Sequence, residues 1–227
     1  MRKLAAPALF MALAALACKG GSAAAAPELK TDDQKTLYAL GLVMSQNLAR
    51  FNLSESDLEF VKAGIADGVL KRPEQVKLDE FRPKISTLMQ ARSAAGAAVD
   101  KQTGAAFLEK AAAEPGAVKT PAGFVYKEIT AGSGNAPAAT DKVKVHYKGT
   151  LIDGTVFDSS IERGEPVVFP LNQVIPCWTA GVQMMKVGGK SRLVCPSELA
   201  YGDRGAPPKI NPGATLVFEV ELLGIEP

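Results

Sequence analysis

Residues 174–196 read VIPCWTAGVQMMKVGGKSRLVCP and hold the single Trp of the chain and two of its three Cys. Pro176 suits the first turn of a helix, where its missing N–H leaves no helical bond unmade. Three apolar side chains then recur on one helical face: Trp178, Val182 and Met185. A Gly pair at 188–189 ends the helix. The stretch therefore predicts a short helix that buries its Trp, followed by a strand.

Strand-like segments lie on both sides of this helix. Each one alternates or is rich in β-branched and aromatic residues, and turn residues separate them. They are GFVYKEI (123–129), KVKVHYKGTL (142–151), PVVFPL (166–171), SRLVCP (191–196) and TLVFEVELLGI (215–225). An antiparallel sheet wrapped on one short helix is an α+β plan.

Upstream of these strands the apolar period is helical. Residues 31–51 and 54–70 carry apolar side chains at helical spacing, and the second segment opens with Ser54 and Asp57 in an S-x-x-D cap. A third, Ala-rich pattern begins near Leu78 and exceeds thirty residues, with Pro83 expected in or before its first turn. Two short amphipathic helices bury too little apolar surface to form a core by themselves, so we expect them to pair with a second copy of the chain. The alternative is a monomeric helical hairpin.

The first 26 residues resemble an export signal. A basic start at Arg2 and Lys3 precedes an apolar run that is too short to span a membrane. Two ends fit: lipoprotein-type cleavage before Cys18, or ordinary cleavage within GSAAAAP. We therefore expect a periplasmic protein, either soluble or anchored to the outer membrane through a lipid on Cys18. Both forms reach a compartment that permits disulfides.

Composition argues against several functions. A net charge of +2 without a basic run gives no reason to expect nucleic acid, or any membrane contact beyond an N-terminal lipid. His146 is the one His; alternation places it on the strand face opposite Tyr147, where we expect it to be solvated. The chain has no G-x-S-x-G motif, and its Cys are widely spaced. We therefore expect no nucleophilic triad, no metal and no cofactor.

An apolar and aromatic set remains in the C-terminal half. A core could account for it, but Trp and Tyr carry polar tips that need partners. The loop at 201–213, YGDRGAPPKINPG, is also elaborate for a simple connection. An apolar pocket with a few polar groups describes a ligand site. The candidate residues are Tyr147, Phe157, Asp158, Arg163, Phe169, Val174, Ile175, Trp178, Tyr201, Ile210 and Phe218.

Four segments resemble the FKBP-type peptidyl-prolyl cis-trans isomerases: residues 145–160, 174–196, 199–205 and 213–225. The segment LYALGLVMSQNL (37–48) is similar to the Mip/FkpA-like branch of that family. The resemblance implies an antiparallel half-barrel sheet around the short helix, preceded by a helical domain that forms a homodimer. We accordingly expect a dimerisation domain at 27–77, a linker helix at 78–115 and an isomerase domain at 116–227.

The resemblance also implies roles for the candidate residues. Trp178 forms the floor of the pocket, while Asp158 and Tyr201 bind the prolyl substrate or a macrolide such as tacrolimus or rapamycin. Arg163 lies near Asp158, and the other candidates form the walls. Val167 and Ala206 occupy wall positions that are often bulky, which implies a wider mouth and modest activity. The expected partners are unfolded or nascent exported proteins that contain proline.

The implied chemistry needs neither a nucleophile nor a metal. Rotation about an X-Pro bond crosses a barrier of about 18–20 kcal/mol because the planar amide loses its resonance. A dry apolar pocket favours the less polar twisted form, while the Ile175 N–H and the Tyr201 hydroxyl fix the flanking carbonyls. Asp158 would polarise or orient near the reacting carbonyl. The alternative is a dimeric periplasmic chaperone that binds prolyl segments with little turnover.

The family architecture brings Cys177, at the start of the short helix, close to Cys195, at the end of the returning strand. Once Cys18 is lipidated or removed with the signal, these two Cys remain in an oxidising compartment. We therefore expect a disulfide between them; two small buried thiols are the alternative.

Overall fold

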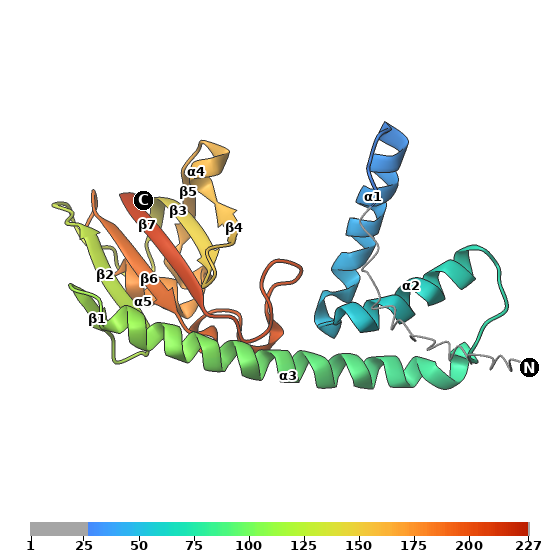
Figure 1. Ribbon diagram of the computed structural model, residues 1–227. Helices are drawn as coiled ribbons and strands as arrows, with labels where there is room; N and C mark the ends of the chain where they lie inside the picture. Colours follow the sequence, from blue (N-terminus) through green and yellow to red (C-terminus); the bar gives the residue numbers. More distant parts are fainter. Residues whose placement is uncertain (1–26, 227) are drawn as a thin grey trace, which may run out of the picture. The chain divides into compact units, whose positions relative to one another are not determined.

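The computed structural model describes residues 27–226 (Figure 1). The predicted export signal and Cys18 lie outside these residues. The chain divides into two compact units, Met1–Ala39 and Leu40–Pro227. Among the described residues, no helix is both long and apolar enough to cross a bilayer.

Three helical elements precede the long helix. They are α1 (Asp32–Ser45), the 3₁₀ helix η1 (Gln46–Phe51) and α2 (Glu55–Val69). The first helix was predicted to reach residue 51, but it ends at Ser45 and tightens into η1, which Asn52 closes in a left-handed conformation. Ser54 and Asp57 form the predicted capping box of α2. No described residue of α1 or α2 is buried.

Helix α3 extends over Leu78–Ala112. Pro83 was expected in the first turn or before it, yet it lies in the second turn. Proline has no N–H to offer the carbonyl four residues before it, so this end of the helix lacks one internal hydrogen bond. The buried residues of α3 form one stripe: Ala97, Gly104, Leu108 and Ala111.

The C-terminal half forms a seven-stranded antiparallel sheet in the order β1-β2-β6-β7-β3-β4, with β5 paired to β3. The strands are β1 (Ala117–Lys119), β2 (Val125–Thr130), β3 (Lys142–Leu151), β4 (Val156–Ser159), β5 (Val167–Pro170), β6 (Lys190–Cys195) and β7 (Leu216–Glu226). Sequence patterns missed β1 and β4 because each is short and carries only one or two β-branched or aromatic residues, whereas the equally short β5 has three in a row. His146, expected to be solvated, is half-buried, with Nδ1 3.2 Å from the Ser160 hydroxyl.

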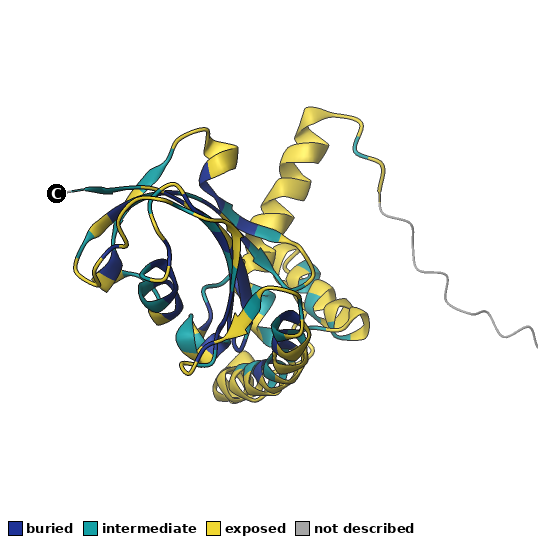
Figure 2. Ribbon diagram, turned by 90° about the vertical axis from the view of Figure 1, so that its left-hand side faces the viewer, coloured by how far each residue is buried: buried dark blue, intermediate teal, exposed yellow. Residues whose placement is uncertain are grey.

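The sheet curves around α5 (Pro176–Val182), as Figure 2 shows. Met185 was expected on this helix; it lies beyond the helix end, although it is buried. Short helical turns complete the domain: α4 (Ser160–Arg163), η2 (Leu171–Gln173), η3 (Ser197–Leu199) and η4 (Gly202–Arg204).

Alternation along the central strands gives the sheet two apolar faces. Leu193 and Phe218 pack in the main core with α5, whereas Val194 and Val217 pack in a second cluster with Leu108 of α3. Since neighbouring residues of a strand point to opposite faces, both helices are held by the same strands.

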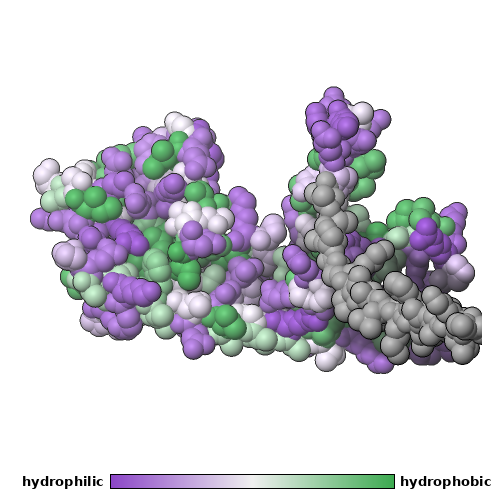
Figure 3. Space-filling view, viewed as in Figure 1, coloured by the Kyte–Doolittle hydropathy of each residue, from purple (hydrophilic) through white to green (hydrophobic). Residues whose placement is uncertain are grey.

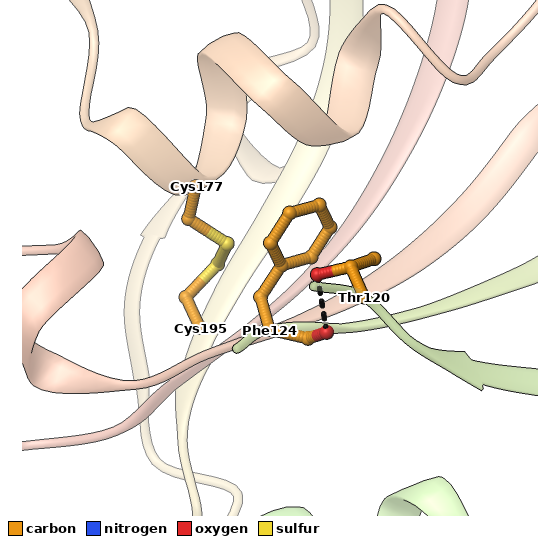
Figure 4. The surroundings of a disulfide bond; sticks show 4 residues. All are labelled: Thr120, Phe124, Cys177 and Cys195. Atoms are coloured by element: carbon orange, nitrogen blue, oxygen red, sulfur yellow. Dashed lines mark hydrogen bonds between the residues drawn. A yellow bond between two sulfur atoms is a disulfide. The ribbon is translucent and has the colours of Figure 1, made fainter. Parts of the chain in front are cut away.

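A disulfide joins Cys177 of α5 to Cys195 of β6, with 5.8 Å between their Cα atoms. Both residues are fully buried. Figure 4 shows the bond near Phe124, whose carbonyl accepts a 2.9 Å hydrogen bond from the Thr120 hydroxyl. The predicted pairing is present, and it fastens the first turn of α5 to the sheet.

We expect replacement of both Cys177 and Cys195 by Ala to lower the free energy of unfolding by about 3 kcal/mol, the loop-closure value for a bridge of this span. Denaturant unfolding with and without reductant measures the loss. Reductant should destabilise the wild type and leave the double variant unchanged. A wild-type midpoint that does not respond to reductant would contradict a stabilising bridge.

Candidate functional site

A cavity of about 410 Å³ lies between α5 and the concave face of the sheet. Nine of its ten lining residues were candidates from the sequence. The lining comprises Tyr147, Phe157, Asp158, Phe169, Gln173, Val174, Ile175, Trp178, Tyr201 and Phe218. Most of these side chains are apolar or aromatic, so the cavity offers a poor environment for charge.

Trp178 forms the centre of the aromatic floor. Its ring lies 5.2 Å from Tyr147, 5.7 Å from Phe169 and 5.3 Å from Phe218, edge to face in each case. These distances and angles fall within the favourable range for aromatic pairs. Trp178 is buried, and its indole N–H has no hydrogen-bond partner among the described residues. The floor is thus closely packed and retains one uncommitted donor.

Asp158 is the charged group of the pocket wall. One carboxylate oxygen accepts from the Tyr147 hydroxyl, and the other accepts from Nη1 of Arg163. A second nitrogen of Arg163 donates to the Tyr147 oxygen over 3.2 Å. Burial alone would raise the pKa of Asp158, but these hydrogen bonds outweigh it and hold the pKa below its ordinary value. The carboxylate is therefore ionised at neutral pH and cannot act as a proton donor.

Burial, followed by the hydrogen bond to the Asp158 carboxylate, raises the pKa of Tyr147. Its hydroxyl therefore keeps its proton near neutral pH. The wall thus consists of a neutral phenol and a charged carboxylate, neither of which changes protonation state between about pH 5 and pH 8.

Besides the Trp178 indole N–H, two hydrogen-bond donors of the lining are uncommitted. The Tyr201 side chain is 41% exposed, and its hydroxyl has no partner in the described part of the chain. Ile175 caps the start of α5 and accepts from Trp178 through its carbonyl, while its N–H has no partner among residues 27–226. Both donors are available to carbonyl groups of a ligand.

Some predicted residues occupy other positions. Arg163 does not line the cavity, because its guanidinium is held by Asp158 and Tyr147 at the rim. Ile210 is buried in the core, paired through its backbone with Ala206. Val167 and Ala206 pack partly buried against that core and do not reach the lining, because their side chains are small.

Gln173 is the lining residue that sequence reasoning missed. It ends η2 directly before Val174. A search for aromatic and apolar residues overlooks such a polar side chain, and its one signal was its place next to Val174 and Ile175.

A larger groove, of about 570 Å³, lies between α3 and the loop at 203–212. It contains no aromatic lining residue, so it lacks the stacking surface that the smaller cavity provides. Among the described residues, no group of three His, Cys, Asp or Glu is placed to hold a metal.

Residues 134–223 match the family model described as FKBP-type peptidyl-prolyl cis-trans isomerase. Residues 33–127 match the domain amino-terminal to that isomerase. The chain is 42% identical to the FKBP-type 22 kDa peptidyl-prolyl cis-trans isomerase of Escherichia coli, over 88% of this chain and 98% of that protein. It is 36% identical to the outer membrane protein MIP of Legionella longbeachae, over 88% and 89%.

A solved structure, that of FkpA from Escherichia coli, is similar with a TM-score of 0.67. The two sequences are 39% identical, and the match covers 88% of this chain and 99% of that one. The similarity thus spans both the helical half and the sheet.

We expect Tyr147→Phe to lower the free energy of unfolding by roughly 1 kcal/mol at pH 7, because one hydrogen bond to a half-exposed carboxylate is lost. The pKa of Asp158 is depressed by folding, so its ionised form stabilises the fold above about pH 4 and this contribution fades as pH falls. Denaturant unfolding at pH 7 and at pH 3 should show the variant's deficit shrinking in acid. An equal deficit at both pH values would contradict the role of the charge.

Proposed function

Because this chain belongs to the FKBP-type peptidyl-prolyl cis-trans isomerases, we propose that its aromatic pocket twists X-Pro amides of unfolded exported proteins. The supporting observation is the combination of an apolar aromatic floor with two uncommitted donors near it, Tyr201 and the Ile175 N–H. The apolar floor receives the pyrrolidine ring. The two donors hold carbonyls on either side of the bond that turns.

The pocket lowers the barrier by discriminating between two forms of one amide. The planar amide is polar, with negative charge on oxygen and positive charge on nitrogen, and the twisted amide has lost that resonance. Transfer out of water therefore destabilises the planar form more than the twisted form. No bond breaks and no proton moves, which agrees with a site that contains no nucleophile–base pair.

Asp158 contributes through its charge. An ionised carboxylate beside the carbonyl of the residue before proline repels the negative charge that resonance places on that oxygen in the planar amide. This repulsion weakens as the amide twists, so it favours the transition state over the ground state. Arg163 and Tyr147 keep the carboxylate ionised and fix its direction.

The clients are unfolded or nascent exported proteins that contain proline, and the compartment is the periplasm. A disulfide between Cys177 and Cys195 is consistent with an oxidising compartment. A lipid on Cys18 and a free mature form remain the two alternatives for the N-terminus. Macrolides such as tacrolimus are the expected inhibitors of the pocket.

The protein acts as a homodimer formed by its helical half. Apolar side chains of α1 and α2 lie exposed in the single chain, including Leu40 at 54% and Phe60 at 79%. Apolar surface is visible over these helices in Figure 3. Helix α3 also has an apolar hollow, which is lined by Phe81, Ile85 and Leu88. A second copy that covers these faces would remove them from water.

We expect the mature protein to accelerate X-Pro isomerisation in a peptide assay and in proline-limited refolding, with tacrolimus blocking both. Tyr201→Phe should lower kcat/KM roughly fivefold, the value of one hydrogen bond. Asp158→Asn should also lower it, since the variant keeps the shape and loses the charge. Tyr38→Phe, at an exposed Tyr outside the pocket, is the matched control.

A wild-type protein that binds prolyl peptides but leaves their isomerisation at the uncatalysed rate would contradict this proposal and support the chaperone alternative.

The dimer is tested by the mass of the mature protein in solution. Light scattering should give twice the chain mass, and Leu40→Glu should reduce it to one chain by placing charge on the exposed apolar face. Val118→Glu, an equally exposed apolar position on β1, should leave the mass unchanged. Leu40→Glu should retain activity on short peptides. A wild-type protein whose measured mass equals that of one chain would refute the dimer.

A further inference from the structure

Helix α3 contacts the isomerase domain in two places. Its last turns, with Leu108 and Ala111, pack against the outer face of the sheet. The same stripe continues toward the N-terminus through Ala97 and Gly104, which are also buried. Lys101 lies between them at helical spacing, so it projects from the same side of the helix.

This second contact leaves no room for side chains. A Cβ on Gly104 would lie 2.1 Å from the Thr215 hydroxyl oxygen, and a Cβ on Gly213 would lie 2.4 Å from the Ala97 carbonyl oxygen. Gly213 also has φ +80°, which disfavours other residues. The helix backbone therefore rests directly on the end of the loop at 201–213, which we name the lid loop.

An ion pair fixes the other end of the lid loop. The ammonium of Lys101 lies 2.6 Å from a carboxylate oxygen of Asp203 and 3.9 Å from one of Glu198. The hydrogen bond to Asp203 holds the pKa of Lys101 above its usual value. Asp203 follows Tyr201 by two residues, so α3 holds the chain beside the pocket hydroxyl.

The lid loop is braced internally. The Gly213 N–H donates to the Gly202 carbonyl over 2.9 Å, which ties the two ends of the loop together. Ala206 and Ile210 exchange both backbone hydrogen bonds, and Lys209 near the tip donates to the Phe157 carbonyl over 2.8 Å. A displacement of the base is therefore transmitted to Tyr201.

The open groove of about 570 Å³ beside this contact includes Lys101, Asp203 and Arg204 in its lining. The base of the lid loop thus has free space next to it. The tip remains attached to β4 through Lys209, so a weakened base would move while the tip stays in place.

We propose that α3 positions the substrate-binding hydroxyl of Tyr201, and that Lys101 is a positioning residue that acts through Asp203. The proposal rests on the role given to Tyr201 above. The Tyr201 hydroxyl has no hydrogen-bond partner in the described part of the chain, so no side-chain hydrogen bond holds it and its position follows the backbone of the lid loop. Loss of the Lys101–Asp203 ion pair, which we call the brace, should weaken substrate binding. It should leave the twisting step itself intact, because the aromatic floor is untouched.

A charge-reversal cycle on the mature protein tests this. Lys101→Glu and Asp203→Lys should each raise KM for a prolyl peptide roughly two- to fivefold, the range for a partly exposed ion pair, with kcat unchanged. The double variant restores the pair in reverse and should return KM close to the wild-type value. Lys110→Glu is the matched control, since Lys110 is exposed on the same helix without a side-chain ion pair among the described residues.

Hydrogen exchange of the lid loop provides a readout that does not depend on turnover. Each single reversal should speed exchange at the Gly202 to Gly213 segment, and the double variant should restore protection. Single variants with wild-type KM, or a double variant whose KM rises further, would overturn the proposal. Faster exchange with unchanged KM would show a brace that does not position Tyr201. A wild type without isomerase activity would instead count against the proposed function, while the exchange data would still test the brace.

Discussion

The rest of the domain depends on one contact, the packing of Trp178 against the curved sheet. Its ring meets Tyr147 from β3, Phe169 from β5 and Phe218 from β7, each edge to face. One side chain thus brings three strands to a short helix whose seven residues would not persist in water. The adjacent disulfide adds a covalent link from the same turn to β6.

The sheet serves two helices because its central strands bury both faces. Leu193 and Val194 are neighbours in β6, yet one packs against the pocket side and the other against α3. The pocket and the linker helix therefore share one scaffold. Contacts of α3 with the lid loop extend this coupling from the outer face of the sheet to the rim of the pocket.

The sequence predicted the parts of the site that rest on local pattern or on long ordered motifs. The buried face of α5, the longer strands, the Cys177–Cys195 pair and nine lining residues all fall in this class. Gln173 was missed because a polar residue carries no apolar signal. Gly104 and Thr215 are more than one hundred residues apart, and no periodicity relates them. Such packing is visible only once the chain has folded.

The central claim is that catalysis arises from desolvation and charge repulsion, with no proton transferred. The solvent deuterium isotope effect on kcat/KM tests it most directly, because proton transfer in the transition state slows in deuterated water. We expect equal rates in the two solvents, with a ratio of about 1, since no bond to hydrogen changes. A ratio of about 2 or more would show that a proton is transferred in the transition state and would contradict the mechanism.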